Sequence, residues 1–201
     1  IKAPADRKSG NVCSDVRKMN EEMDVLIQKT ILELLKHKEY KDIQMKEIAE
    51  KANIGRRTLY RYFAYKDEIM NKFVSGLMND MADIINQVNR MDLEGVAYAY
   101  LLLWEKHIEE MKLLKKAHLM YLLEDNLPDL VMGISLKTKY KILSREEWKK
   151  VMDQWSEEDR YHLCYMLAGY FKVAQLWMEE KNRKSPEEMA GIMRRIVLRE
   201  G

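Results

Sequence analysis

The chain has 201 residues, of which 47% are apolar and 34% charged, with only 8 glycines and 3 prolines. So few helix breakers favour long helices over many short strands, in one domain or in a small module joined to a larger one. No apolar run approaches the roughly 18 residues of a membrane-spanning helix, so we expect a soluble globular protein. The two cysteines, Cys13 and Cys164, do not indicate a disulfide framework and fit a reducing cytoplasm.

The N-terminal part of the chain is predicted to form an arm followed by three helices. Residues 1–16 have no apolar period and are expected to form a flexible arm. Apolar residues then recur at helical spacing and predict a helix over about 17–38. Two short helices follow, at about 45–52 and 58–63. The Asn53-Ile54-Gly55 segment between them suits a turn that needs positive φ.

The remainder of the chain also shows helical patterning. The apolar period continues through residues 66–88, 96–108, 111–123, 161–177 and the segment after Pro186. Sequences of the capping-box type, a serine followed three residues later by an acidic residue, occur at Ser144, Ser156 and Ser185. Residues 161–177 are apolar on most of the circumference, which predicts a helix covered from several sides. We therefore predict an all-α chain with no confident strand.

Charge is unevenly distributed along the chain. The formal net charge is +2, but residues 1–66 hold 15 Lys and Arg against 10 Asp and Glu, and the remainder holds 20 against 23. A basic N-terminal part followed by a slightly acidic remainder suits a nucleic-acid-binding module attached to an interaction domain.

The segment between Tyr40 and Lys66 has the layout of a helix-turn-helix. Its second helix has an apolar inner face, with Leu59 and Phe63, and an outer face rich in arginine. Such a helix fits the major groove of DNA, while nearby cations contact phosphates. On any single arginine, a solvated helix face is the alternative interpretation, and Tyr60 could simply be a packing aromatic.

The string IAEKANIGRRTLYRYF from Ile48 to Phe63, followed by Lys66-Asp67-Glu68-Ile69, resembles the TetR family of transcription regulators. The resemblance covers roughly residues 20–75 and implies a three-helix DNA-binding domain over 17–66. A long helix would join this domain to an all-helical effector-binding and dimerisation domain over 67–201. The residues implied in DNA contact are Lys46, Gly55, Arg56, Arg57, Thr58, Tyr60, Arg61 and Lys66, with Tyr60 and Lys66 at positions that usually contact phosphates.

This sequence departs from the family pattern at several positions. Gly55 stands where Ser is common and Arg57 where Gly is common, while Gln44 and Tyr65 replace the usual Thr and Ser caps. These changes leave the motif intact but bear on the operator sequence. Arg57 could add a base contact, for example to guanine.

The C-terminal part, from Gly169 through Pro186, is similar to the end of family members from low-GC Gram-positive bacteria. The similarity implies a homodimer in which the last two helices pair with their copies, and therefore a pseudo-palindromic operator. The interface residues expected are Tyr170, Val173, Trp177, Met189, Ile192, Met193 and Ile196. The alternative is that these helices close a monomeric core.

The resemblance further implies a small-molecule effector, and repression as the default action. Candidate pocket residues are Met81, Trp104, His107, Met111, Tyr121 and Tyr165. Plain core packing is the competing interpretation, and for His107 it is that of a satisfied core histidine.

Signatures of catalysis and metal binding are absent from the sequence. There is no nucleophile elbow, no phosphate-cradling Gly-rich loop and no Cys/His cluster at ligand spacing. We therefore expect no enzyme activity, no metal and no cofactor, and as partners double-stranded DNA, a second copy and an effector, but no membrane. A regulator in the cytoplasm, on the nucleoid when DNA-bound, fits best; an adapter that acts chiefly through protein contacts is the alternative.

Overall fold

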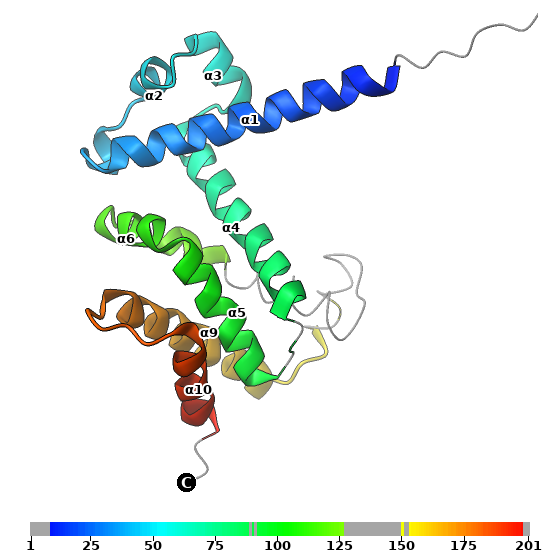
Figure 1. Cartoon of the computed structure of the whole chain (residues 1–201), viewed down its shortest axis with the longest axis vertical. Helices are drawn as coiled ribbons and strands as arrows, with labels where there is room; N and C mark the ends of the chain where they lie inside the picture. Colours follow the sequence, from blue (N-terminus) through cyan, green and yellow to red (C-terminus); the bar gives the residue numbers. More distant parts are fainter. Residues whose placement is uncertain (1–8, 89, 91, 127–149, 151–152, 199–201) are drawn as a thin grey trace, which may run out of the picture. The chain divides into compact units, whose positions relative to one another are not determined.

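The computed structural model describes residues 9–88, 90, 92–126, 150 and 153–198, with side chains from residue 17 onward. Within these ranges the chain forms helices and no strand, which confirms the predicted all-α class (Figure 1). The helices are α1 (Ser9–Leu35), η1 (Tyr40–Asp42, a 3-10 turn), α2 (Met45–Lys51), α3 (Arg56–Tyr62), α4 (Lys66–Val88), α5 (Leu93–Lys106), α6 (Ile108–Lys116), α9 (Glu157–Glu179) and α10 (Pro186–Val197). The chain divides into two compact units between Phe73 and Val74, inside α4 and seven residues beyond the predicted boundary.

Helix α1 begins earlier than the sequence pattern predicts. Residues 9–16, which we expected in a flexible arm, belong to it, and the helix ends at Leu35 rather than near Lys38. No proline lies between Ser9 and Leu35, so the backbone can continue the helix without losing a hydrogen bond. The apolar period that we used covers only part of α1, and the helix begins before it.

The first unit has a small apolar core shared by all its helices. Helix α2 packs against both α1 and α3. The core consists of Ile27, Ile31 and Leu35 of α1, Ile43, Ile48 and Ala49 around α2, Leu59 and Phe63 around α3, and Ile69 and Met70 of α4, all at most 4% exposed. Helices of seven residues are too short to be stable in water alone, so α2 and α3 depend on this core.

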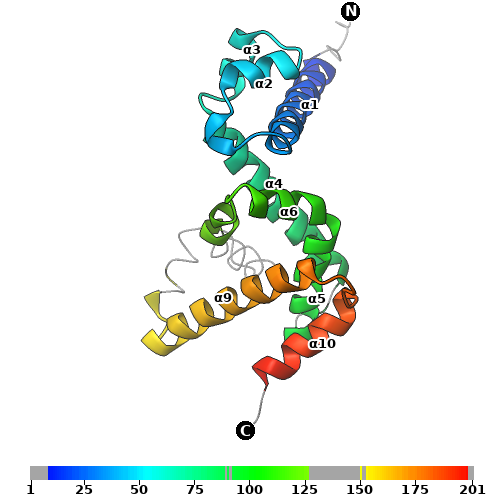
Figure 2. The same cartoon turned by 90° about the vertical axis from the view of Figure 1, so that its left-hand side faces the viewer.

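The second unit is organised around α5, which packs against α6, α9 and α10 (Figure 2). Trp104 of α5 is 1% exposed, and its ring lies 5.9 Å from the ring of Phe171 of α9. Capping boxes begin α9 and α10, where Ser156 and Ser185 accept from backbone N–H groups three residues on. These two predicted helix starts are confirmed, whereas the third, at Ser144, lies outside the described residues.

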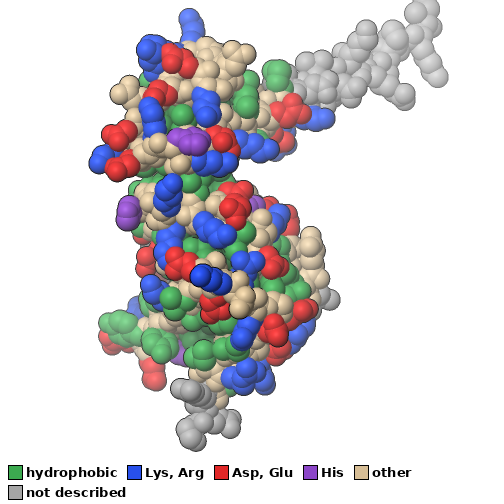
Figure 3. Space-filling view, turned by 60° about the vertical axis from the view of Figure 1, so that its left-hand side comes forward, with side chains coloured by type: hydrophobic (Ala, Val, Ile, Leu, Met, Phe, Trp, Pro, Cys, Tyr) green, Lys and Arg blue, Asp and Glu red, His purple; other side chains and the backbone are tan. Residues whose placement is uncertain are grey.

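Helix α9 is covered over only part of its length within the described chain. Its C-terminal half packs into the core, with Trp177 fully buried. Its N-terminal half is largely exposed, including Tyr161 at 68% and Tyr165 at 78%. Hydrophobic side chains also reach the surface of the second unit on the face shown in Figure 3. Among the described helices, none combines the length and the apolar character needed to cross a membrane.

The Tyr100 hydroxyl is buried in the second unit and has no hydrogen-bond partner of normal geometry among the described residues. The Tyr100 ring lies near two other aromatic rings, with the Trp104 ring centroid 6.0 Å and the Tyr170 ring centroid 6.3 Å from that of Tyr100. Burial raises the pKa of this hydroxyl, so it stays protonated. In the unfolded chain the same group bonds to water, and its desolvation on folding costs about 1–3 kcal/mol.

We predict that Tyr100→Phe leaves the free energy of unfolding unchanged or raises it by about 1 kcal/mol, because the ring stays and only the unpaired hydroxyl goes. Tyr98→Phe on the same helix is the matched control: it removes a hydrogen bond with Glu187 and should cost about 0.5–1.5 kcal/mol. Urea unfolding followed by circular dichroism measures both. A loss above about 1 kcal/mol in Tyr100→Phe would show that the hydroxyl has a partner in solution.

Candidate nucleic-acid interface

Helix α3 begins after a tight turn that one residue makes possible. Asn53 has a φ of 54°, in the left-handed region that asparagine tolerates. Gly55, which we expected to share this role, has a φ of −66° and a ψ of 142°, an ordinary extended conformation before the helix. A Cβ at Gly55 would meet only the Thr58 hydroxyl oxygen, at 3.8 Å. Asn53 alone therefore supplies the positive φ of the turn.

The inner face of α3 fixes how the helix lies in the first unit. Leu59 is fully buried, and Phe63, just after the helix, is 4% exposed. On the flank of the helix, the Tyr62 hydroxyl donates to the Asn20 side-chain oxygen of α1 at 2.7 Å. The backbone N–H of Ala64 donates to the Glu68 carboxylate at 2.7 Å, which closes the α3–α4 corner.

The outer face of α3 is open to solvent and carries most of the predicted contact residues. Arg56, Arg57 and Arg61 are exposed, and Thr58 is half-buried. Tyr60 is 54% exposed, which argues against a purely packing role for this aromatic ring.

The cations of this face differ in their surroundings. The Arg61 guanidinium lies 5.3 Å from the centroid of the Tyr62 ring, which orients it. The Arg57 guanidinium forms no hydrogen bond or ion pair with any described residue. Tyr65, 58% exposed just beyond α3, extends the face and was treated in the sequence only as a replaced cap.

Two glutamates of α2 lie among these cations. Glu50 lies 3.8 Å from Arg56 and 3.7 Å from Lys46, and all three side chains are more than half exposed. Glu47 instead accepts from Lys38 and from the backbone N–H of Gln44, and these two bonds lower the pKa of its carboxyl. Glu50 therefore partly neutralises the cationic face, a feature that a count of Lys and Arg in the motif does not reveal.

The last predicted DNA-contact residue, Lys66, has different surroundings from the exposed cations of α3. It is half-buried at the first position of α4, and its ammonium donates to backbone carbonyls of the η1 segment. The structure thus gathers Lys46, Gly55, Arg56, Arg57, Thr58, Tyr60 and Arg61 around α3 and directs the Lys66 ammonium inward.

Residues 27–72 match the sequence profile described as "Bacterial regulatory proteins, tetR family". The chain carries the DNA-binding domain of a TetR-family transcriptional regulator. The match spans the α2–turn–α3 arrangement and the start of α4, the segment in which the cationic face is built.

Solved structures share the fold over most of the chain. A TetR transcriptional regulator from Streptococcus agalactiae 2603V is 14% identical, with 92% of this chain and 98% of that chain covered at a TM-score of 0.59. A tetR-family transcriptional regulator from Streptomyces coelicolor is 17% identical, with 85% and 78% covered at a TM-score of 0.50. No curated protein is significantly similar to the chain in sequence. The likeness to the two structures extends the all-α fold beyond the DNA-binding domain.

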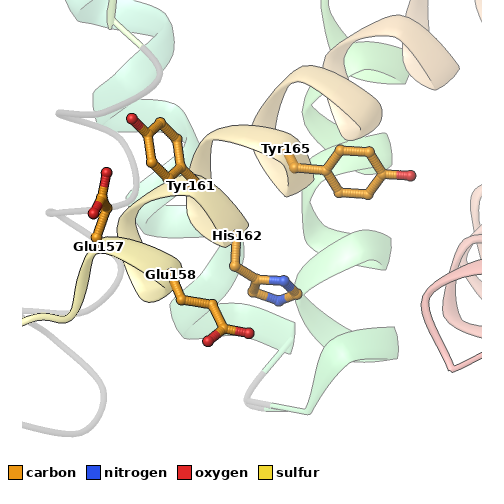
Figure 4. A pocket seen from close by; sticks show the side chains of 5 residues that line it. All are labelled: Glu157, Glu158, Tyr161, His162 and Tyr165. Atoms are coloured by element: carbon orange, nitrogen blue, oxygen red, sulfur yellow. The ribbon is translucent and has the colours of Figure 1, made fainter.

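The predicted effector-pocket residues of the regulator occupy different environments. Met81, Trp104 and Met111 are at most 1% exposed and belong to the core of the second unit. Tyr121 and Tyr165 are 50% and 78% exposed. Tyr165 lines a shallow surface pocket on α9 together with Glu157, Glu158, Tyr161 and His162 (Figure 4). These five side chains splay outward from one helix and do not converge on a point.

His107 is a partnered histidine at the junction of α5 and α6. Its Nε2 and the Lys106 ammonium both lie 2.7 Å from one oxygen of Asp80 in α4. Partial burial raises the pKa of Asp80, but the bonds from Lys106 and His107 outweigh it, so the pKa lies below the usual range. The cluster links α4 to the α5–α6 junction within the second unit.

The predicted dimer-interface residues also separate into two groups. Trp177 and Met193 are at most 2% exposed inside the subunit, and Trp177 donates to the Lys184 carbonyl at 2.9 Å. They are therefore not available to a partner. Tyr170, Val173, Met189 and Ile192 are half-buried, and Ile196 is 53% exposed. Leu176, 55% exposed, belongs with the second group and was not singled out in the sequence.

We predict that Glu50→Gln raises affinity for random-sequence duplex DNA about two- to fivefold at low salt, since surface ion pairs of this kind are worth about 0.5–1 kcal/mol. The substitution frees Arg56 and Lys46 and removes a negative charge that faces the phosphates. Fluorescence anisotropy measures the affinity, with Glu33→Gln on α1 as the control, because Glu33 pairs with Lys36 and not with the cations of α3. Equal affinities for Glu50→Gln and the wild type would show that Glu50 lies outside the contact surface.

Proposed function

We propose that this regulator is a homodimeric repressor that binds a pseudo-palindromic operator through α3 and leaves it when a small effector binds the second unit. The observation that carries the proposal is the two-sided α3. Its inner face is fixed by Leu59 and Phe63, while its outer face presents arginines and Tyr60 to solvent. A helix held from behind with an exposed cationic face has the properties that major-groove recognition requires.

The cations of α3 are suited to different parts of DNA recognition. Arg57 has no hydrogen-bond or ion-pair partner among the described residues, and its planar group can bond guanine through two hydrogen bonds, so we assign it to base readout. Arg56 and Lys46 are shared with Glu50 and suit phosphate contact, which fixes register. Tyr60, Thr58 and Arg61 would complete the contact set on the phosphates, with the Gly55 backbone close to the DNA.

The exposed apolar side chains of α9 and α10 support the homodimer. Tyr161, Tyr165 and Leu176 of α9 and Ile196 of α10 are all more than half exposed. Several large apolar side chains exposed on two helices favour an interaction site on a soluble protein. A second copy would cover them and would bring two α3 helices to half-sites about 34 Å apart or more.

Release by an effector would act through the second unit. Met81 of α4, Trp104 of α5 and Met111 of α6 are buried on three successive helices. The bond between Asp80 and His107 links α4 to the junction of α5 and α6. A ligand that inserts among these helices would favour one placement of α4, which continues into the DNA-binding unit. Differential affinity of the ligand for two such states is the requirement for release.

In vitro selection from random duplex DNA at near-physiological salt should recover a pseudo-palindromic site. Arg57→Ala should relax the selected sequence at one position of each half-site and weaken binding by about 1–3 kcal/mol. Lys181→Ala, which removes an exposed cation of the second unit, is the control and should leave the selected sequence unchanged. Failure of the wild type to enrich any site contradicts the proposed function.

The selected complex also tests the effector. The low-molecular-weight fraction of a bacterial extract should lower the anisotropy of a labelled selected duplex bound to the protein. Release that persists with a nonspecific duplex would reflect ionic strength instead, and a complex that no fraction dissociates would contradict the effector part of the proposal.

The double variant Leu176→Glu/Ile196→Glu should be monomeric in analytical ultracentrifugation, because it places charges in the proposed interface and like charges across a symmetric contact cost several kcal/mol. Tyr121→Glu, at an exposed aromatic outside α9 and α10, is the matched control and should leave the dimer intact. A double variant that remains dimeric would place the interface elsewhere on the chain.

A further inference from the structure

The Lys66 ammonium is surrounded by backbone carbonyls of a segment far away in the sequence. Its Nζ donates to the carbonyl oxygens of Tyr40 at 2.5 Å, Ile43 at 3.0 Å and Lys41 at 3.2 Å. The same Nζ lies 4.5 Å from the centroid of the Tyr40 ring. An ammonium group has three N–H donors, and these three carbonyls match them in number.

A cation is unfavourable at the position that Lys66 has on its own helix. Lys66 is the first residue of α4, where the positive end of the helix dipole disfavours a cation. The three carbonyl dipoles and the Tyr40 ring offset this cost. The Tyr40 hydroxyl in turn donates to the Asp67 carboxylate in the first turn of α4, so a second bond joins the same two segments.

The segment bound in this way sets the start of α2. Ile43 immediately precedes Gln44, the residue that caps α2, and the Ile43 side chain is 2% exposed in the core. Helix α2 packs directly against α3. The Lys66 side chain therefore fixes the η1–α2 corner against the α3–α4 corner, and the α2–α3 pair is held between these two corners.

We propose that Lys66 is a positioning residue for DNA recognition, an internal clamp that fixes the α2–α3 pair, and not a phosphate contact. The three carbonyls already match the three N–H donors of the ammonium, so a phosphate could reach it only by displacing one of them. The inference rests on the proposed function for its DNA-binding readouts, whereas the clamp itself can be tested on the free protein.

Three variants separate a clamp from a phosphate contact. Lys66→Met removes the ammonium and keeps a chain of similar length. Lys66→Arg keeps the charge, but a planar guanidinium cannot direct donors at three carbonyls that converge on one atom. Arg61→Met is the matched control, since it removes an exposed cation of α3 that the proposed function places on the phosphates.

On the free protein, Lys66→Met and Lys66→Arg should both lower the melting temperature by about 5 °C or more, because hydrogen bonds to a charged group are lost. Arg61→Met should leave it unchanged. On random-sequence duplex, the slope of log Kobs against log KCl concentration should stay that of the wild type in Lys66→Met, but flatten by about 0.9 in Arg61→Met. DNA assays are run well below the lowest melting temperature of the variants. If Lys66→Met does not fold, Lys66→Arg is used for the comparison instead.

The positioning role has its own readout. The ratio of affinities for a selected site and for random duplex should fall about fivefold or more in both Lys66 variants, the low end of what a misplaced base contact costs. A lowered melting temperature with an unchanged ratio would reduce Lys66 to a merely structural residue and overturn the proposal.

The proposal would also be overturned if Lys66→Met had a flattened salt slope and wild-type stability while Lys66→Arg was fully functional. Lys66 would then be a phosphate contact. Absence of DNA binding by the wild type would instead remove the proposed function, and the positioning role with it. A lowered melting temperature in the two Lys66 variants would then still identify the clamp in the free protein.

Discussion

The DNA-binding unit depends on the burial of Leu59 and Phe63. Helix α3 has seven residues, and a helix of that length is not stable in water on its own. Its existence and its direction therefore come from these two apolar side chains, which are buried in the core of the first unit, and from its packing against α2. The outer face of the helix is available for DNA because the inner face supplies the stability.

Periodicity and motif spacing predicted much of this architecture, for reasons that particular residues make clear. Ile48, Leu59 and Phe63 are apolar at positions that only a helix-turn-helix places together, and all three are in the core. The serines at 156 and 185 start helices because their side chains bond to backbone groups three residues on, an interaction local in sequence. The extension of α1 to Ser9 was missed because residues 9–16 show no apolar period in the sequence.

The roles of individual side chains were harder to predict, because they depend on neighbours distant in sequence. Lys66 meets carbonyls more than twenty residues earlier, and His107 meets Asp80 of another helix. Trp177 and Met193 were predicted at a subunit interface from a stripe that the structure directs into the subunit. An apolar stripe shows that a helix face is covered, but not whether the cover belongs to the same chain.

The division of α3 into a supporting face and a solvent face has a consequence for how the protein can diverge. Arg56, Arg57, Tyr60 and Arg61 contribute little to the core, and substitutions at such surface positions usually change stability by less than about 0.5 kcal/mol. Copies of the gene could therefore exchange these four residues while the fold stays intact. The DNA sequence that the protein reads can drift independently of the scaffold that holds the reading helix.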